Sequence, residues 1–135
     1  MGSKLAGGRW NTPGRAVVYT SEHPATAVLE VLVHAERPQL LRDSFVMLSA
    51  EVDDTLVRTL DVSALPARWN ELGDMTIGQR IGDTWFDKQV SAALRVPSVI
   101  LRGQFNVLLN PEHPDWAQVD LGEPEPFMFD PRLAR

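Results

Sequence analysis

Residues 25–34 read ATAVLEVLVH, an apolar run that contains one acidic residue, Glu30. The run predicts a helix that begins at Pro24, because proline suits the first helical position, and ends at about His34, before Pro38. Apolar residues lie on every side of this helix, a pattern typical of a buried helix. A buried carboxylate is unfavourable unless it is paired or hydrogen-bonded. Glu30 therefore lies either on a narrow solvent-facing strip or in a functional site.

The composition is that of one ordinary soluble domain. A chain of 135 residues, 44% hydrophobic and 23% charged, can bury a core without disulfides or metals. The absence of cysteine and the scatter of three histidines exclude a thiolate nucleophile and disfavour a metal centre. A net charge of −5 argues against direct nucleic-acid binding. With no membrane-length apolar segment and no signal-peptide core, a cytoplasmic location is expected, and homo-oligomerisation is left open.

Short β-branched and apolar runs between turn formers predict a single α+β domain with six or seven strands and two or three helices. A second helix is expected over residues 76–88, where Thr76 and Gln79 form a capping-box pattern, although two glycines weaken it. Proline cannot donate to a strand ladder, so Pro97 is expected at a sheet edge or bulge. The expected strands cover residues 16–20, 44–52, 55–62, 92–101 with an interruption at Pro97, 105–110, 116–122 and 126–130.

The stretch from residue 7 to residue 34 also carries the most informative polar side chains. Arg9 lies in a glycine-rich turn, where its planar guanidinium could hold a phosphate. Tyr19 ends the following strand. Taken singly, Arg9 is more simply interpreted as a surface ion pair and Tyr19 as a core aromatic residue. For Glu30, a structural role as a carboxylate paired with an arginine and a role in a functional site are equally favoured. The chain has no P-loop, dinucleotide fingerprint or nucleophile elbow, so these residues alone indicate at most a phosphate-containing ligand.

The block GGRWNTPGRAVVYTSEHPATAVLEVLVH (7–34) resembles the opening block of RES-domain toxins, the partners of Xre-type antitoxins in bacterial toxin–antitoxin operons. Later blocks match in the same order: IGDTW (81–85), LRVPSVIL (94–101), NVLLNPEHPDW (106–116) and PFMFDPRL (126–133). The resemblance implies one RES domain over residues 1–135. It also implies a split β-sheet core with flanking helices, similar to ADP-ribosyltransferases of the diphtheria-toxin type. Family members usually carry another strand ahead of the GGRWN block, so the short N-terminus is expected to leave the cleft less complete.

The resemblance further implies the site residues. The Arg, Glu and Ser that give the family its name, its functional tyrosine and two asparagines fall on Arg9, Glu30, Ser98, Tyr19, Asn106 and Asn110. Arg9, Tyr19 and Glu30 are implied as catalytic, and the other three as substrate-binding. Two of these assignments have plain structural alternatives, because Asn110 precedes Pro111 in what is also an ordinary turn and Ser98 follows a proline.

The activity that the resemblance implies is depletion of NAD+, by hydrolysis or phosphorolysis, with NAD+ as substrate and no cofactor. Cleaving the nicotinamide–ribose bond passes through an oxocarbenium-like transition state, which Glu30 would stabilise from a dry pocket. Arg9 would hold the phosphates, Tyr19 would stack on nicotinamide, and Ser98 would bind nicotinamide or ribose. Transfer of ADP-ribose to a protein is the alternative activity. A non-catalytic module that only binds its antitoxin is the third interpretation.

Overall fold

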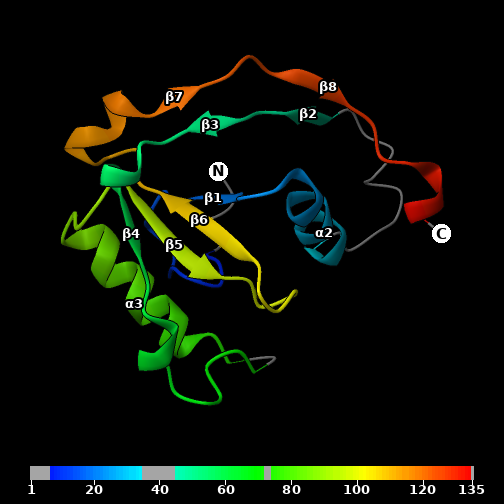
Figure 1. The fold of residues 1–135 in the computed structure, drawn as a ribbon. Coiled ribbons are helices and arrows are strands. Elements are labelled where there is room, and N and C mark those ends of the chain that lie inside the picture. Colours follow the sequence, from blue (N-terminus) through cyan, green and yellow to red (C-terminus); the bar gives the residue numbers. More distant parts are fainter. Residues whose placement is uncertain (1–6, 35–44, 72–73, 135) are drawn as a thin grey trace.

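The computed structural model describes residues 7–34, 45–71 and 74–134. Within them lie two α-helices, a four-stranded sheet and two shorter two-stranded pairings (Figure 1). The helices are α2 (Pro24–His34) and α3 (Thr76–Asp87). The strands are β1 (Val18–Ser21), β2 (Phe45–Met47), β3 (Ala50–Glu51), β4 (Val57–Thr59), β5 (Ala93–Pro97), β6 (Phe105–Leu109), β7 (Asp120–Leu121) and β8 (Glu125–Phe127). The predicted α+β class is confirmed.

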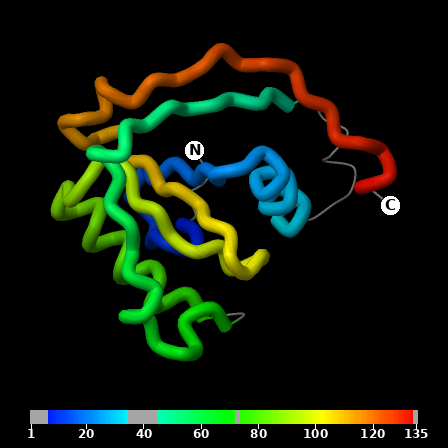
Figure 2. Tube along the Cα trace, viewed as in Figure 1, coloured from blue at the N-terminus to red at the C-terminus, as the bar shows by residue number. Residues whose placement is uncertain are grey.

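The main sheet has the strand order β1-β6-β5-β4. Strand β6 pairs antiparallel with both β1 and β5, whereas β4 pairs parallel with β5. The remaining strands pair as β2 with β8 and β3 with β7, both antiparallel, and together they run as one long ribbon past the main sheet and α2 (Figures 1 and 2). Gly122 continues the ribbon between its two paired parts by donating its backbone N–H to Ser49 O at 2.7 Å.

Several predicted strands are shorter than expected. The region 44–52 divides into β2 and β3, and a 3-10 turn precedes β4 in the region 55–62. Residues 116–118 of the range 116–122 belong to the 3-10 helix η4 (Pro114–Gln118), so that strand prediction was wrong except at β7. Of 126–130, only the first two residues belong to β8. The expectation that this chain lacks the family's strand ahead of the GGRWN block concerns residues outside those that the structure describes.

Pro97 ends a strand rather than interrupting one. It is the last residue of β5, an inner strand, so the expected edge or bulge position was wrong. The ladder with β4 stops at Arg95, which leaves Pro97 beyond that neighbour. Pro97 therefore does not interrupt the pairing of β5 with β4, even though it cannot donate a backbone hydrogen bond.

Helix α2 has the predicted bounds but not the predicted burial. Only Thr26 is buried, and Val31 and Val33 are 38% and 56% exposed. The expectation of a helix buried on every side was therefore wrong. The helix lies at the side of the sheet, next to β1, and turns part of its apolar surface outward (Figure 1).

Helix α3 covers the predicted range, but its predicted capping box is absent. The N-cap is Met75, and Asp74 Oδ1 accepts the backbone N–H of Thr76. The Gln79 amide instead donates to two carbonyl oxygens of the 8–11 turn, at 2.9 Å and 3.3 Å. The glycines of the helix have a related function, because Gly78 and Gly82 lie directly against the backbone carbonyls of residues 9 and 10.

The core joins the 8–11 turn, the end of α3 and one face of the sheet. Its buried members are Trp10, Val17, Trp85, Phe86, Leu94, Val96 and Leu108, with Leu60, Trp69 and Ile81 packed against them. The two tryptophans Trp10 and Trp85 are thus core residues. Because α3 holds Trp10 from one side and the sheet holds it from the other, the turn that carries Arg9 has a fixed place on the sheet.

Candidate functional site

Glu30 lies within a small polar cluster at one end of the main sheet. Its side chain is 24% exposed. Oε1 accepts a hydrogen bond from Asn106 Nδ2 at 2.8 Å and a longer one from Ser98 Oγ at 3.4 Å. Glu30 is thus held by polar partners while its side chain stays partly exposed to solvent, and its place in a functional site stays a prediction.

Ser98 contributes to this cluster from the turn that follows β5. It is buried, and its backbone N–H donates to Gln104 O across the turn to β6. Its hydroxyl oxygen accepts the backbone N–H groups of Ile100 and Leu101, both at 3.2 Å. Ser98 therefore both closes the turn and directs its hydroxyl hydrogen at Glu30.

Strand register places the other polar residues on the same face. Ser21 is paired with Asn106 across β1 and β6, and Tyr19 with Leu108. Residues opposite each other in an antiparallel pair share a face, as do residues two apart along a strand. Tyr19, Ser21 and Asn106 thus lie on the face that also carries the core residue Leu108. The polar cluster continues the apolar core along one sheet face.

Tyr19 is fixed by its hydroxyl group while part of its ring stays open. Tyr19 is 38% exposed. Its hydroxyl nevertheless accepts the Trp10 backbone N–H at 3.1 Å and donates to Asn11 Oδ1 in a short hydrogen bond. Burial of this hydroxyl raises the pKa of Tyr19 to about 12. Tyr19 is therefore a neutral phenol near pH 7, and it is better suited to positioning than to proton transfer.

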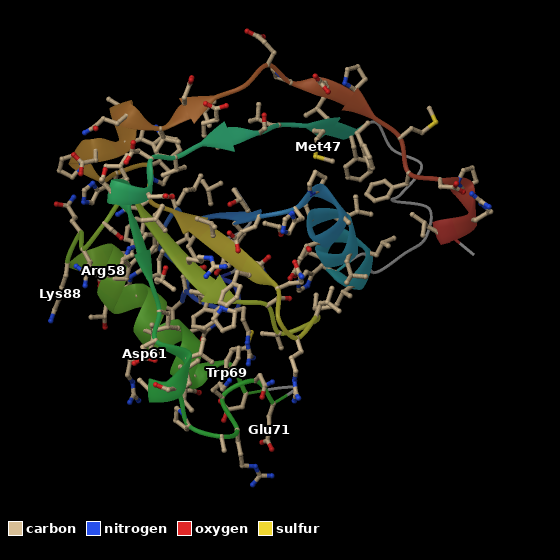
Figure 3. All side chains as sticks on the ribbon, in the orientation of Figure 1. Met47, Arg58, Asp61, Trp69, Glu71 and Lys88 are labelled. Carbon is tan, nitrogen blue, oxygen red and sulfur yellow. The ribbon has the colours of Figure 1, made fainter. Side chains whose placement is uncertain are left out.

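Arg9 faces a different neighbour. Its Nη1 donates to Asp74 O at 3.1 Å and its Nη2 to Trp69 O at 2.6 Å. The guanidinium also lies 5.8 Å from the centre of the Trp69 ring, and Trp69 itself comes from the segment between β4 and α3 (Figure 3). Burial lowers the pKa of Arg9 from its usual value, and the Asp74 carboxylate opposes this effect. The buried Nε has no hydrogen-bond partner among the described residues.

The predicted site residues fall into three places: the Glu30 cluster and its sheet face, the 8–11 turn, and the far end of β6. Glu30, Ser98 and Asn106 are joined by hydrogen bonds, and Tyr19 lies two residues from Ser21 on the same strand face. Arg9 belongs to the turn that covers the Tyr19 hydroxyl, since a Cβ on the adjacent Gly8 would lie 2.6 Å from that oxygen.

Asn110 lies away from the Glu30 cluster. It follows the opposite end of β6, four residues beyond Asn106, is fully buried, and accepts the Glu112 N–H in a turn. Its role as a substrate ligand stays a prediction, with the turn as its observed contact. His34 lies one turn after Glu30 on α2, and its Nε2 is 3.7 Å from Glu30 Oε2.

Two residues that contact the predicted site residues were not predicted from the sequence. Ser21 donates to Asn106, and Trp69 lies against Arg9. Ser21 stands inside the quoted block, but a serine at a helix start is usually interpreted as a cap. Trp69 comes from a segment without a recognisable pattern. Among the residues that the structure describes, no three His, Asp or Glu side chains gather to hold a metal ion. None of the helices there is long and apolar enough to cross a membrane.

A family model described as the RES domain matches residues 1–130. The chain belongs to the RES-domain family. The resemblance noted from the sequence is thereby confirmed.

Three similar proteins support the assignment. Toxin Res of Photorhabdus laumondii is 38% identical over 135 residues, which are 99% of this chain and 86% of that protein. The Prs ADP-ribosylating toxin of a Sphingobium species is 34% identical over 137 residues, 99% of this chain and 84% of that protein. The crystal structure of the MbcT–MbcA toxin–antitoxin complex of M. tuberculosis includes a chain with a TM-score of 0.78 at 18% identity, over 98% of this chain and 77% of that one. The RES domain described here therefore shares that fold.

Proposed function

We propose that this RES domain is the toxin of a toxin–antitoxin pair and that it cleaves the nicotinamide–ribose bond of NAD+. The observation that carries the proposal is a carboxylate, Glu30, held at Oε1 by Asn106 and Ser98 in a partly exposed position. Relatives of similar length that are named toxins support the biological role. The name of the Sphingobium relative supports the substrate, because ADP-ribosylation draws its ADP-ribose from NAD+.

Glu30 would act on charge that develops in the transition state. As the bond from ribose C1′ to nicotinamide breaks, nicotinamide leaves with the bonding electrons and the ribose becomes oxocarbenium-like. A fixed carboxylate near the ribose hydroxyls stabilises that positive charge without reorganising. Water then adds at C1′ and releases a proton in hydrolysis, whereas phosphate adds there in phosphorolysis. The enzyme would thus be an NAD+ glycohydrolase or phosphorylase.

The other residues would bind and orient the substrate. Arg9 keeps N–H groups beyond the two that hold Asp74 O and Trp69 O, and these are suited to the pyrophosphate. The open part of the Tyr19 ring is suited to stacking on nicotinamide, since its hydroxyl is already occupied. Ser98 and Asn106 would act mainly by holding Glu30.

Two alternatives share this site. Transfer of ADP-ribose to a protein is favoured by the name of the Sphingobium relative. The second alternative is a chain that only binds its antitoxin, and such a chain would show neither reaction.

The antitoxin partner itself is of the Xre type in our proposal. A partner of this kind is supported by the toxin–antitoxin complex that shares the fold.

Proton NMR of NAD+ mixed with the purified protein, with and without phosphate, tests the proposal. Free nicotinamide is expected, and the rate should fall on the order of 100-fold or more in Glu30→Gln. Glu123→Gln, at an exposed position, is the matched control and should keep the full rate. Undiminished cleavage by Glu30→Gln would refute the role of Glu30. Labelled NAD+ separates the alternatives, because a labelled protein band indicates transfer.

A further inference from the structure

One serine outside the predicted site completes the hydrogen-bond network of Glu30. Ser21 is the last residue of β1, and it lies opposite Asn106 of β6. Its hydroxyl oxygen is 2.7 Å from Asn106 Oδ1, and Asn106 Nδ2 is in turn 2.8 Å from Glu30 Oε1. A continuous chain of hydrogen bonds thus runs from Ser21 through the Asn106 amide to the carboxylate.

The direction of these hydrogen bonds follows from the chemistry of the groups. An ionised carboxylate only accepts hydrogen bonds, so the Asn106 atom that faces Glu30 must be the NH₂ group. The Asn106 carbonyl oxygen then faces Ser21, whose hydroxyl must donate to it. With the amide reversed, its oxygen would face the Glu30 oxygen, and two acceptors would meet without a hydrogen between them. Glu30 therefore sets the orientation of the amide, and the Ser21 hydroxyl holds the amide in that orientation by donating to its carbonyl oxygen.

The network also distinguishes the two oxygens of Glu30. Oε1 accepts from Asn106 and Ser98, whereas Oε2 accepts no hydrogen bond from the described residues and has His34 Nε2 at 3.7 Å. Oε1 is thus the anchored oxygen and Oε2 the one left for a ligand. Any loss of the Asn106 hydrogen bond would allow the carboxylate to rotate and would mix these two roles.

We propose that Ser21 is a positioning residue that orients the Asn106 amide, so that Glu30 is anchored through Oε1 and presents Oε2 to the substrate. The positioning of Glu30 follows from the contacts, and its effect on catalysis rests on the proposed function. Ser21 does not touch the substrate in this scheme. It acts only through Asn106.

The kinetic test compares Ser21→Ala, Ser21→Thr and Thr20→Val in the purified full chain with NAD+ as substrate. Ser21→Ala should lower kcat roughly tenfold with little change in KM, because the carboxylate is misplaced while the rest of the substrate contacts remain. Ser21→Thr keeps the hydroxyl and should restore the rate. Thr20→Val is the matched control, since Thr20 Oγ1 also donates to β6, at Val107 O, but from the neighbouring position on the opposite face. An unchanged kcat in Ser21→Ala, or an equal loss in Thr20→Val, would overturn the catalytic part.

A second measurement does not depend on activity. Two-dimensional nitrogen–proton NMR follows the Asn106 side-chain NH₂ group directly, and Asn106→Ala assigns its signals. In the wild-type protein the two protons should be distinct and protected from exchange with water. In Ser21→Ala they should shift and exchange faster, and Ser21→Thr should restore them. Signals that stay unchanged in Ser21→Ala would refute the positioning role, even if NAD+ proves not to be the substrate. Shifted signals in a protein that leaves NAD+ intact would support the positioning role and refute the proposed function.

Discussion

Gly82→Ala is the substitution for which the structure predicts the largest effect from the smallest change. A Cβ at residue 82 would lie 1.7 Å from the carbonyl oxygen of Trp10 and 2.7 Å from its carbonyl carbon. At Gly78, one helical turn earlier, the nearest atom would be Arg9 O at 2.8 Å. Separations below 3.0 Å are essentially never seen for Cβ atoms, so residue 82 needs a shift of roughly 1 Å or more and residue 78 only a few tenths.

Two opposing effects decide the magnitude. Alanine favours a helix interior over glycine by about 1 kcal/mol, and this gain is common to both positions. Overpacking of a well-packed interior costs about 1–3 kcal/mol and sometimes more. The free energy of unfolding should therefore fall by about 2 kcal/mol more in Gly82→Ala than in Gly78→Ala. Since the shift displaces the turn that holds Arg9, NAD+ cleavage should fall as well.

Urea denaturation of both variants and the wild-type protein, followed by circular dichroism, measures the difference. In thermal scans the same gap should appear as roughly 5–10 °C between the two midpoints. Because helix propensity contributes equally at the two positions, it does not affect their order. A Gly82→Ala protein as stable as Gly78→Ala would show that the α3 glycines do not serve the approach of the turn.

Two further predictions concern groups that hold the same turn. Asp83→Ala should lower the free energy of unfolding by about 1–3 kcal/mol, because its carboxylate accepts both the backbone N–H and the hydroxyl of Thr12 at 2.9 Å and 2.7 Å. Asp87→Ala removes a more exposed carboxylate and should cost less than about 1 kcal/mol, and equal losses in urea denaturation would contradict this difference. Tyr19→Phe should flatten the pH dependence of stability above pH 10, because the pKa of Tyr19 is raised from 10.0 to about 12 in the folded protein. Its contribution is complete below pH 10 and is lost as pH rises towards 12, since only the unfolded chain releases the proton in that range, and urea midpoints from pH 8 to pH 11 test this slope.

Local signals in the sequence were sufficient for the helices. Pro24 at the first helical position and the apolar run behind it gave the bounds of α2, which the structure reproduces. The same kind of signal failed where a side chain has a distant partner. Gln79 matches a capping box in the sequence, but its amide binds the 8–11 turn about 70 residues away in the chain. A pattern of neighbouring residues cannot show that distant carbonyl oxygens compete with the helix end for the Gln79 amide.

The local sequence indicated only part of the site, for a related reason. Glu30 stood out as a single carboxylate in an apolar run, yet its partners Ser98 and Asn106 are 68 and 76 residues away. Those two were identified through the family resemblance, not through spacing. Ser21 was passed over because its partner is set by the pairing of β1 with β6, which no local pattern specifies.

The register of that pairing links the core to the site. Leu108 is fully buried and lies opposite Leu94 on one side and Tyr19 on the other. Asn106 is two residues away on the same strand, so it must share the face that Leu108 buries. A slip of one residue would place Leu108 in the opposite face and would turn the Asn106 amide away from Glu30. The apolar packing that fixes Leu108 therefore also fixes the hydrogen-bond donor of Glu30, and the carboxylate is placed by the core as much as by its own helix.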